Sequence, residues 1–432
     1  MDYQEALERL HSLLSFGVRP GLSRIQELLR RLGDPHRRIP SFIHVGGTNG
    51  KGSVSAMLDS MIRADGKQTG LFTSPHLHSH TERYRVNGQP IPEPVFANLF
   101  ARVWSCIQQI QSEGWESPTE FEAATALAFL YFAECQVDVA VIEVGLGGDM
   151  DSTNVIPSRL QIITNVGMDH MAYLGSTIPE IARCKAGIIK PGSTVITGAD
   201  GEALPVIADE VQQQGATLLT LGRDIQILHS QVGRSGSTVD LSVSGRQYRE
   251  LVIPLLGRHQ IANGALAVAG AQQVGIPECA IRKGLAATVW PGRLEIISQQ
   301  PLVVLDGAHN APATQVLSQA LAEYWPEKRI LCLIGMLVDK QREESLAPLL
   351  PRLSRAIVTP PAFAERVGDW QRLVEICQAG GVPAQAVEDR HQACDEAVAL
   401  VRAGEYDMLL VCGSLHLLAD VRLYLLEAVK SA

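Results

Sequence analysis

The sequence predicts an α/β fold in two domains, and three observations lead to that prediction. Its 432 residues exceed what one hydrophobic core usually serves. Continuous apolar runs, typical of strands buried on both faces of a parallel sheet, alternate with stretches of helical periodicity. The segment TVWPGRLE then places Pro291 and Gly292 between two such series. We therefore expect a first domain over residues 1–290 and a smaller, Rossmann-like α/β domain over residues 291–432.

In the first domain, two amphipathic helices are expected over residues 2–14 and 22–32. A short apolar strand then runs straight into a glycine-rich loop that precedes a helix, and an apolar helix is followed by further strands. These elements are expected at 42–45, 54–62, 121–132, 137–145 and 160–167. Short alternating runs broken by Gly and Ser predict a small antiparallel patch over 217–254, and helical periodicity returns at 259–275.

In the second domain, apolar strands separated by plausible helices are expected at 302–307, 329–336, 355–360 and 407–414. Composition agrees with a globular protein whose core is aliphatic, because 46% of residues are apolar and only 5% are aromatic. The formal net charge of −9 argues against binding to nucleic acid or to an anionic membrane surface. The scattered cysteines form no CxxC pair, which suits a reducing compartment.

The start of the chain lacks the basic stretch and apolar run of a secretory signal. The longest apolar stretch, 123–133, is too short to span a bilayer. These features predict a cytoplasmic protein.

The strongest local signal for function is the loop between the strand at 42–45 and the helix that follows it. Its residues are Gly47, Thr48, Asn49, Gly50, Lys51, Gly52 and Ser53. Glycines let backbone N–H groups close around phosphates, a lysine can reach the β- and γ-phosphates, and a serine can ligate Mg²⁺. The alternative is a plain glycine-rich turn with a surface lysine. Because strand and helix are both in place, we interpret the loop as an ATP-binding P-loop, although Gly52 separates the lysine from the serine.

This form of the loop resembles that of the Mur ligase superfamily, and specifically of folylpolyglutamate synthases and dihydrofolate synthases. The resemblance continues in family order along nearly the whole chain, through FTSPHL (72–77), ERYRVNG (82–88), TEFE (119–122), IEVGLGG (142–148), DSTN (151–154), TNVGMDH (164–170), KAGIIKPG (185–192), GRHQIANGALA (257–267), PGRLE (291–295) and DGAHN (306–310). It implies a ligase that uses ATP and two Mg²⁺ ions to join L-glutamate to a folate, and in many bacterial relatives also to dihydropteroate. We expect the chain to be a monomer.

Five residues are expected near magnesium. Glu143 ends a predicted parallel strand, where ligands of α/β sheets gather, and its carboxylate suits a hard metal. The resemblance adds Ser53, Ser74 and His170 as ligands. It also implies that Lys185 is carbamylated and supplies oxygen ligands to a second Mg²⁺. From composition alone, Lys185 would be a surface cation, and His170 a structural histidine.

The resemblance places further residues around nucleotide and substrate. Asn263 corresponds to the residue at the adenine, and three others in the second domain reach phosphate and ribose: Arg293, Asp306 and His309. Nucleotide would thus bridge both domains. Phe121 and Glu122 correspond to the pterin or folate side, with core packing as the alternative for Phe121. Asp339 and Lys340 are also family-like, with an exposed loop pair as the alternative.

The chain departs from the common family pattern at three places. Asp149 stands where Arg is frequent, Cys184 where Glu is frequent, and Ala311 displaces a proline to 312. None of these positions is assigned to metal or phosphate. The rival interpretations are an enzyme with only one of the two folate activities, a peptidoglycan-precursor ligase, and a regulatory P-loop protein without ligase chemistry. Glu143, His170 and Lys185 argue against the last, because a passive binder does not need a second metal site.

Overall fold

A computed structural model describes residues 1–432 except 18, 339–340, 363–366 and 431–432. The chain forms two compact units. One comprises Met1–Ser230, Thr238–Ile253 and Ile261–Thr288, and the other Gln231–Ser237, Pro254–Gln260 and Val289–Ala432. Whether residues 1–290 and 291–432 fold as independent domains stays a prediction. Asp339 and Lys340 lie outside the described residues.

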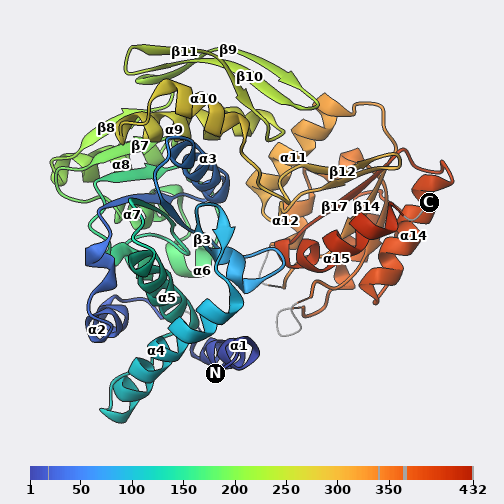
Figure 1. Cartoon of the computed structure of the whole chain (residues 1–432). Helices are drawn as coiled ribbons and strands as arrows, with labels where there is room; N and C mark the ends of the chain where they lie inside the picture. Colours follow the sequence, from blue (N-terminus) through green and yellow to red (C-terminus); the bar gives the residue numbers. More distant parts are fainter. Residues whose placement is uncertain (18, 339–340, 363–366, 431–432) are drawn as a thin grey trace. The chain divides into compact units, whose positions relative to one another are not determined.

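The first unit is built on an eight-stranded sheet in the order β4-β3-β2-β5-β1-β6-β7-β8 (Figure 1). Six neighbouring strands, β2-β5-β1-β6-β7-β8, pair in parallel. At the β2 edge, β3 pairs antiparallel with β2, and β4 pairs antiparallel with β3. The strands are β1 (Ser41–Gly46), β2 (Thr69–Phe72), β3 (Tyr84–Val86), β4 (Gln89–Pro90), β5 (Val139–Glu143), β6 (Leu160–Ile163), β7 (Thr194–Thr197) and β8 (Thr217–Thr220).

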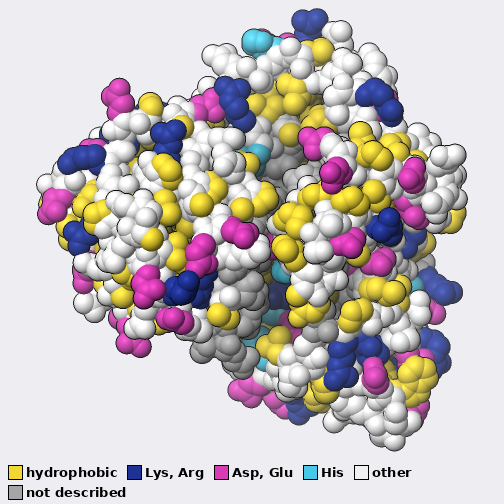
Figure 2. All heavy atoms as spheres, turned by 180° about the vertical axis from the view of Figure 1, so that it is seen from behind, with side chains coloured by type: hydrophobic (Ala, Val, Ile, Leu, Met, Phe, Trp, Pro, Cys, Tyr) yellow, Lys and Arg dark blue, Asp and Glu magenta, His cyan; other side chains and the backbone are white. Residues whose placement is uncertain are grey.

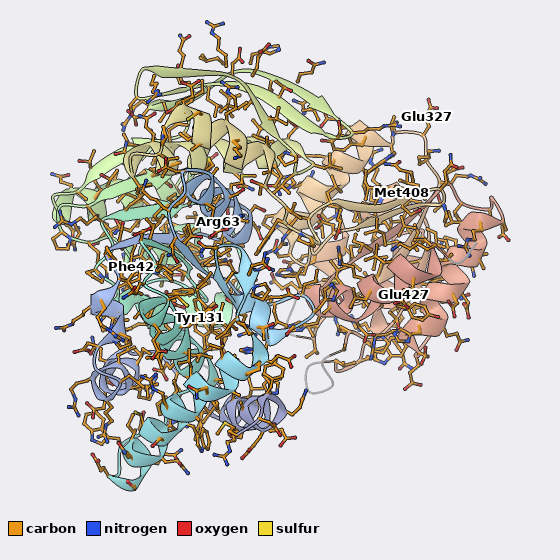
Figure 3. The ribbon with its side chains drawn as sticks, viewed as in Figure 1. Phe42, Arg63, Tyr131, Glu327, Met408 and Glu427 are labelled. Atoms are coloured by element: carbon orange, nitrogen blue, oxygen red, sulfur yellow. The ribbon has the colours of Figure 1, made fainter. Side chains whose placement is uncertain are left out.

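Helices pack against this sheet, and its strands are buried as a result. They are α1 (Tyr3–Ser12), α2 (Ser23–Arg31), α3 (Lys51–Ala64), α4 (Glu93–Ser112), α5 (Glu120–Glu134), α6 (Met171–Leu174), α7 (Ile178–Ala186), α8 (Ala203–Gln213), α9 (Arg258–Gln273) and α10 (Glu278–Ala286). On one face, α5 packs Phe129 against Phe42 of β1, with ring centroids 6.0 Å apart, and the core there also contains Tyr131 (Figure 3). Elsewhere α10 packs so closely on α3 that Ser60 Oγ donates to Gly284 O over 2.6 Å.

The region predicted as a small antiparallel patch divides between two sheets. Its first strand, β8, pairs in parallel with β7 at the edge of the large sheet. The remainder forms a separate three-stranded sheet in the order β11-β10-β9, from β9 (Ile225–Gly233), β10 (Gly236–Val243) and β11 (Arg246–Ile253). A four-residue apolar run carries too little periodicity to reveal which sheet it joins.

The second unit contains a six-stranded sheet in the order β12-β13-β17-β14-β15-β16, in which only the β12–β13 pair is antiparallel. Its strands are β12 (Glu295–Gln299), β13 (Leu302–Leu305), β14 (Ile330–Ile334), β15 (Leu353–Val358), β16 (Ala384–Ala386) and β17 (Met408–Cys412). Its helices are α11 (Ala311–Tyr324), α12 (Arg342–Leu346), α13 (Arg372–Ala379), α14 (Arg390–Arg402) and α15 (Leu415–Ala428). Met408, labelled in Figure 3, belongs to the core of this unit.

The predicted α/β class and the largely parallel sheets are confirmed. Acidic and basic side chains are interspersed over the face that Figure 2 shows. Within the described ranges, no helix is long and apolar enough to cross a membrane.

Candidate active site

The P-loop turns from β1 into α3, and its backbone geometry requires glycine at two positions. Gly47 and Gly50 have φ of 131° and 86°, in the region that side chains disfavour. A Cβ added at Gly47 would lie 2.0 Å from Thr164 Oγ1, and one at Gly50 would lie 2.6 Å from Asn263 Oδ1. The loop is therefore closely packed on both sides. Asn263, predicted at the adenine, lies directly against it.

Residues that follow β6 anchor the P-loop, because β6 is the neighbour of β1 in the sheet. Thr164 Oγ1 donates to Asn49 O over 2.7 Å, and Asn165 Nδ2 donates to the same oxygen over 3.0 Å. In return, Asn49 N donates to Asn165 Oδ1 over 2.9 Å. Thr164 and Asn165 belong to the motif TNVGMDH, but no role was predicted for either of them. Their position directly after an apolar strand was the available signal.

Two lysine amines converge on the loop. Lys51 Nζ donates to the carbonyl oxygens of Gly47 (3.2 Å) and Thr48 (3.1 Å). Lys185, near the end of α7, donates to the same Gly47 oxygen over 2.9 Å although it lies far away in the sequence. Lys185 is only 4% exposed. Burial, and secondly the charge of Lys51, lower its pKa from 10.5 to about 7. Lys185 thus lies at the P-loop, and its lowered pKa favours the unprotonated amine at alkaline pH.

Glu143 and Ser74 also come together. Glu143 is the last residue of β5 and pairs with Val45 on β1, immediately before the P-loop. Its Oε2 accepts from Ser74 N over 3.2 Å. The carboxylate is buried, as is Ser53 in the first turn of α3. Carboxylate and hydroxyl oxygens are therefore located at the carboxyl edge of the sheet, where ligands of such folds bind.

His170 is the least enclosed of the predicted metal ligands. It precedes α6 with φ of 51°, its side chain is 40% exposed, and its Nε2 lies 3.9 Å from Asp169 Oδ1. Among the described residues, no cluster of three or more His, Cys, Asp or Glu side chains could hold a metal. A magnesium site at this edge would therefore need hydroxyl, phosphate, water or carbamate oxygens as well.

Phe121 and Glu122, predicted on the folate side, occupy different environments. Phe121 stacks on Phe72 with ring centroids 5.9 Å apart, and a Cβ on Gly145 would lie 2.4 Å from its Cζ. Phe121 thus lies beside the loop that follows Glu143. Glu122 is buried within the fold, where its Oε2 accepts from Thr119 N (2.8 Å) and Arg24 Nε (3.2 Å). The structure gives Glu122 a helix-capping and ion-pairing role, which leaves Phe121 as the better candidate for substrate contact.

In the second unit, the three predicted nucleotide residues come together. Asp306 follows β13, and its carboxylate accepts from Leu294 N and Ala308 N, both over 2.8 Å. Burial raises the pKa of Asp306, and the charge of Arg293 opposes that rise. A Cβ on Gly307 would lie 3.1 Å from Arg293 Nη1, so the guanidinium passes over this glycine. His309 Nδ1 donates to Gly307 O over 2.8 Å.

Comparisons with known proteins show which family the chain belongs to. The Mur ligase middle domain matches residues 45–271, and the glutamate ligase domain of Mur ligases matches residues 292–415. The dihydrofolate synthase/folylpolyglutamate synthase of Bacillus subtilis is 35% identical, covering 97% of this chain and 98% of that protein. The Escherichia coli protein of the same name is 34% identical, with 96% and 93% covered.

Solved structures give the same result. The folylpolyglutamate synthase of Mycobacterium tuberculosis, complexed with ADP and AMPPCP, superposes with a TM-score of 0.91 at 32% identity, covering 98% of this chain and 99% of that one. The E. coli protein FolC, in complex with DHPP and ADP, superposes with a TM-score of 0.89 at 33% identity, covering 100% and 99%. The chain therefore belongs to the dihydrofolate synthase/folylpolyglutamate synthase family of Mur ligases.

Proposed function

We propose that this chain is a cytoplasmic ligase that uses ATP and Mg²⁺ to join L-glutamate to the carboxylate of a folate. The observation that carries the proposal is the convergence of Lys51 and Lys185 on the carbonyl oxygen of Gly47. A P-loop that only binds nucleotide needs one lysine at its phosphates. A second, buried lysine with a lowered pKa at the same loop is typical of a catalytic site.

Activation is required because a carboxylate does not react with an amine in water at a useful rate. In the proposed reaction, a folate carboxylate oxygen attacks the γ-phosphorus of ATP, and ADP leaves. The amine of glutamate then attacks the acyl carbon of the acyl phosphate, which expels phosphate, forms the amide and releases a proton. For the first step, the P-loop N–H groups and Lys51 would orient the phosphates and offset their charge. A dry site would protect the acyl phosphate from hydrolysis.

The residues at the carboxyl edge of the first sheet fit magnesium, because Ser53, Ser74 and Glu143 offer the oxygen donors that this ion prefers. Glu143 is buried, and a buried carboxylate is stabilised by a cation. Magnesium, when bound, neutralises charge on the transferring phosphoryl group. Ser53, Ser74, Glu143 and His170 would hold the expected two ions, together with a modified Lys185.

The modification proposed for Lys185 is a carbamate. The neutral amine attacks the carbon of CO₂, an N–C bond forms as one C=O π bond opens, and one proton is lost, which leaves one negative charge shared by two oxygens. The lowered pKa of about 7 supports this step, because only the unprotonated amine reacts. The carbamate keeps one N–H, so the hydrogen bond to Gly47 O can persist. An ammonium at this position would instead repel a metal ion.

Phosphate release tests the proposed function. With the wild-type protein, we expect ATP turnover that depends on both a folate and L-glutamate. Lys51→Ala should fold normally and lose turnover by about a hundredfold or more, because the charge at the transferring phosphate is lost. Steady release without either substrate, or release with muramyl nucleotides in place of folate, would refute the assignment.

The scope of the substrates is a separate proposal. Relatives at similar identity are named for both dihydrofolate synthase and folylpolyglutamate synthase activity, and the E. coli structure contains DHPP. We propose that this chain accepts both dihydropteroate and a tetrahydrofolate, and that it acts as a monomer. Glutamylation of tetrahydrofolate without glutamylation of dihydropteroate would reduce the function to chain extension. Elution as a dimer in size-exclusion chromatography would contradict the monomer.

A further inference from the structure

The turn that presents Arg293 has a strained backbone. It comprises residues 291–294 and leads into β12, whose first residue is Glu295. Gly292 has φ of 75°, and Leu294 has φ of 44° while its side chain is buried. A leucine in this left-handed region is uncommon, and such a conformation persists only where neighbouring groups hold it. The groups that hold this turn therefore also set the position of Arg293.

Three hydrogen bonds fix the backbone on either side of Arg293. Gly307 N donates to Gly292 O over 2.9 Å, and Leu294 N donates to Asp306 Oδ2 over 2.8 Å. On the opposite side, Gly292 N donates to Glu295 Oε2 over 2.9 Å. Glu295 thus closes the turn on itself through its side chain.

Glu295 is itself held by an arginine on α15. Arg422 donates through Nε to Oε2 (2.9 Å) and through Nη2 to Oε1 (2.6 Å), a bidentate ion pair whose side chains are 16% and 22% exposed. Pairs of this geometry are stronger and more specific than single contacts. The same helix begins at Leu415, which packs against Gly307, the glycine beneath the Arg293 guanidinium. Helix α15 thus supports both sides of the arginine.

We propose that Glu295 and Arg422 are positioning residues for nucleotide binding. They hold the strained turn in the conformation that keeps the Arg293 guanidinium over Gly307, available to a phosphate of the nucleotide, and they do not contact the nucleotide themselves. The inference rests on the proposed function, which assigns Arg293 to the nucleotide. It adds a role for the last residue of PGRLE and for a residue of α15.

A double-mutant cycle with ADP as the probe tests this role. Isothermal titration calorimetry on the full chain would compare Arg293→Ala, Glu295→Gln and the double variant, with the Tm of each recorded. Both single variants should weaken binding by about tenfold, the order expected for losing a charge-assisted hydrogen bond. The double variant should bind no more weakly than Arg293→Ala, because Glu295 acts through Arg293. Arg422→Lys, which keeps the charge without the bidentate geometry, should give a smaller loss.

The matched control is Glu343→Gln. Glu343 also pairs with an arginine in this unit, Arg372, but at an exposed site on helices α12 and α13 and not on β12 or α15. The Glu343→Gln variant should bind ADP with the affinity of the wild type. Wild-type affinity in both Glu295→Gln and Arg422→Lys, or additive losses in the double variant, would overturn the inference. Unchanged binding by Arg293→Ala would overturn it as well. Failure of the wild-type chain to bind ADP would instead refute the proposed function on which the inference rests.

Discussion

At the scale of single residues, two lysine amines donate to the carbonyl oxygen of Gly47, and they differ in how deeply they are buried. Lys185 is the more deeply buried, and desolvation together with the charge of Lys51 lowers its pKa to about 7. The reactivity of Lys185 thus follows from where the fold places it.

The carbamate prediction follows from this pKa. With ¹³C-bicarbonate, we expect a carbamate signal by ¹³C NMR that is strong above about pH 8 and declines as the pH falls through about 7, because protonation removes the reacting amine. An ordinary lysine, with a pKa near 10.4, would remain protonated over this range. Lys185→Met should remove the signal, and Lys190→Met should retain it. A signal that survives Lys185→Met would contradict the assignment.

The same burial makes stability depend on pH. Between about 7 and 10.5, the unfolded chain carries a proton on Lys185 that the folded chain lacks. The wild-type free energy of unfolding should therefore rise relative to Lys185→Met as pH increases across this window, by about 1.4 kcal/mol per pH unit. Below about pH 7 the difference should be constant, because both states are protonated. Urea denaturation in CO₂-free buffer measures this difference, and a difference that does not change between about pH 7 and pH 10 would show that the amine is not desolvated.

At the scale of elements, the P-loop needs glycine at position 50, because the backbone there has a positive φ and lies against the side chain of Asn263. Gly50→Ala would place a methyl group 2.6 Å from Asn263 Oδ1 at a φ of 86°. We expect ADP affinity to fall by at least about tenfold, since the loop must shift away from its N–H arrangement. Gly66→Ala is the matched control, with φ of 84° and open space around the added methyl group. It should lose a similar amount of backbone stability and keep its affinity. Equal ADP affinity in the two variants would mean that the close packing of Gly50 against Asn263 does not contribute to nucleotide binding.

The anchor after β6 gives a second prediction at this scale. Thr164→Val preserves shape but removes the hydrogen bond to Asn49 O. Affinity for ADP should fall several-fold, the order expected for one hydrogen bond. Thr197→Val removes a comparable buried bond to Ile163 O on the next strand, outside the P-loop. It should reduce Tm without changing affinity. If the two variants lose affinity equally, the anchor has no specific role.

These contacts also show how far the sequence could predict the fold and site. Strands such as β5 and β14 and the helix α5 were predictable because their apolar runs are continuous. The 20-residue helix α4 was not predicted. The strands β2 (TGLF) and β7 (TVIT) were not predicted either, because each holds only two apolar residues, whereas the equally short β6 (LQII) holds three. Glu143 was identifiable at a strand end, but its position beside the P-loop depends on β5 pairing with β1, which are distant in the sequence. The anchoring by Thr164 and the structural role of Glu122 depend on the same kind of long-range contact.

At the scale of the whole molecule, each unit has its own hydrophobic core. Leu127 on α5 lies in a core formed by residues of the first unit, and Leu410 on β17 lies in the core of the second. Both side chains are completely buried. Truncating a leucine in such a position costs about 2–5 kcal/mol, through lost burial and the cavity left behind. Substitutions at these two positions therefore report on the two cores separately.

If the chain divides near residue 290 into independently folding domains, calorimetry should resolve two unfolding transitions. Leu127→Ala should lower one transition and Leu410→Ala the other, each by several degrees. ADP at one hundred times its Kd should stabilise the folded chain by about 2.7 kcal/mol, and the transition that Leu127→Ala lowers, which includes the P-loop, should move to higher temperature. A single transition that both substitutions lower equally would show that the two cores unfold as one cooperative structure, and the predicted boundary would then mark no folding unit.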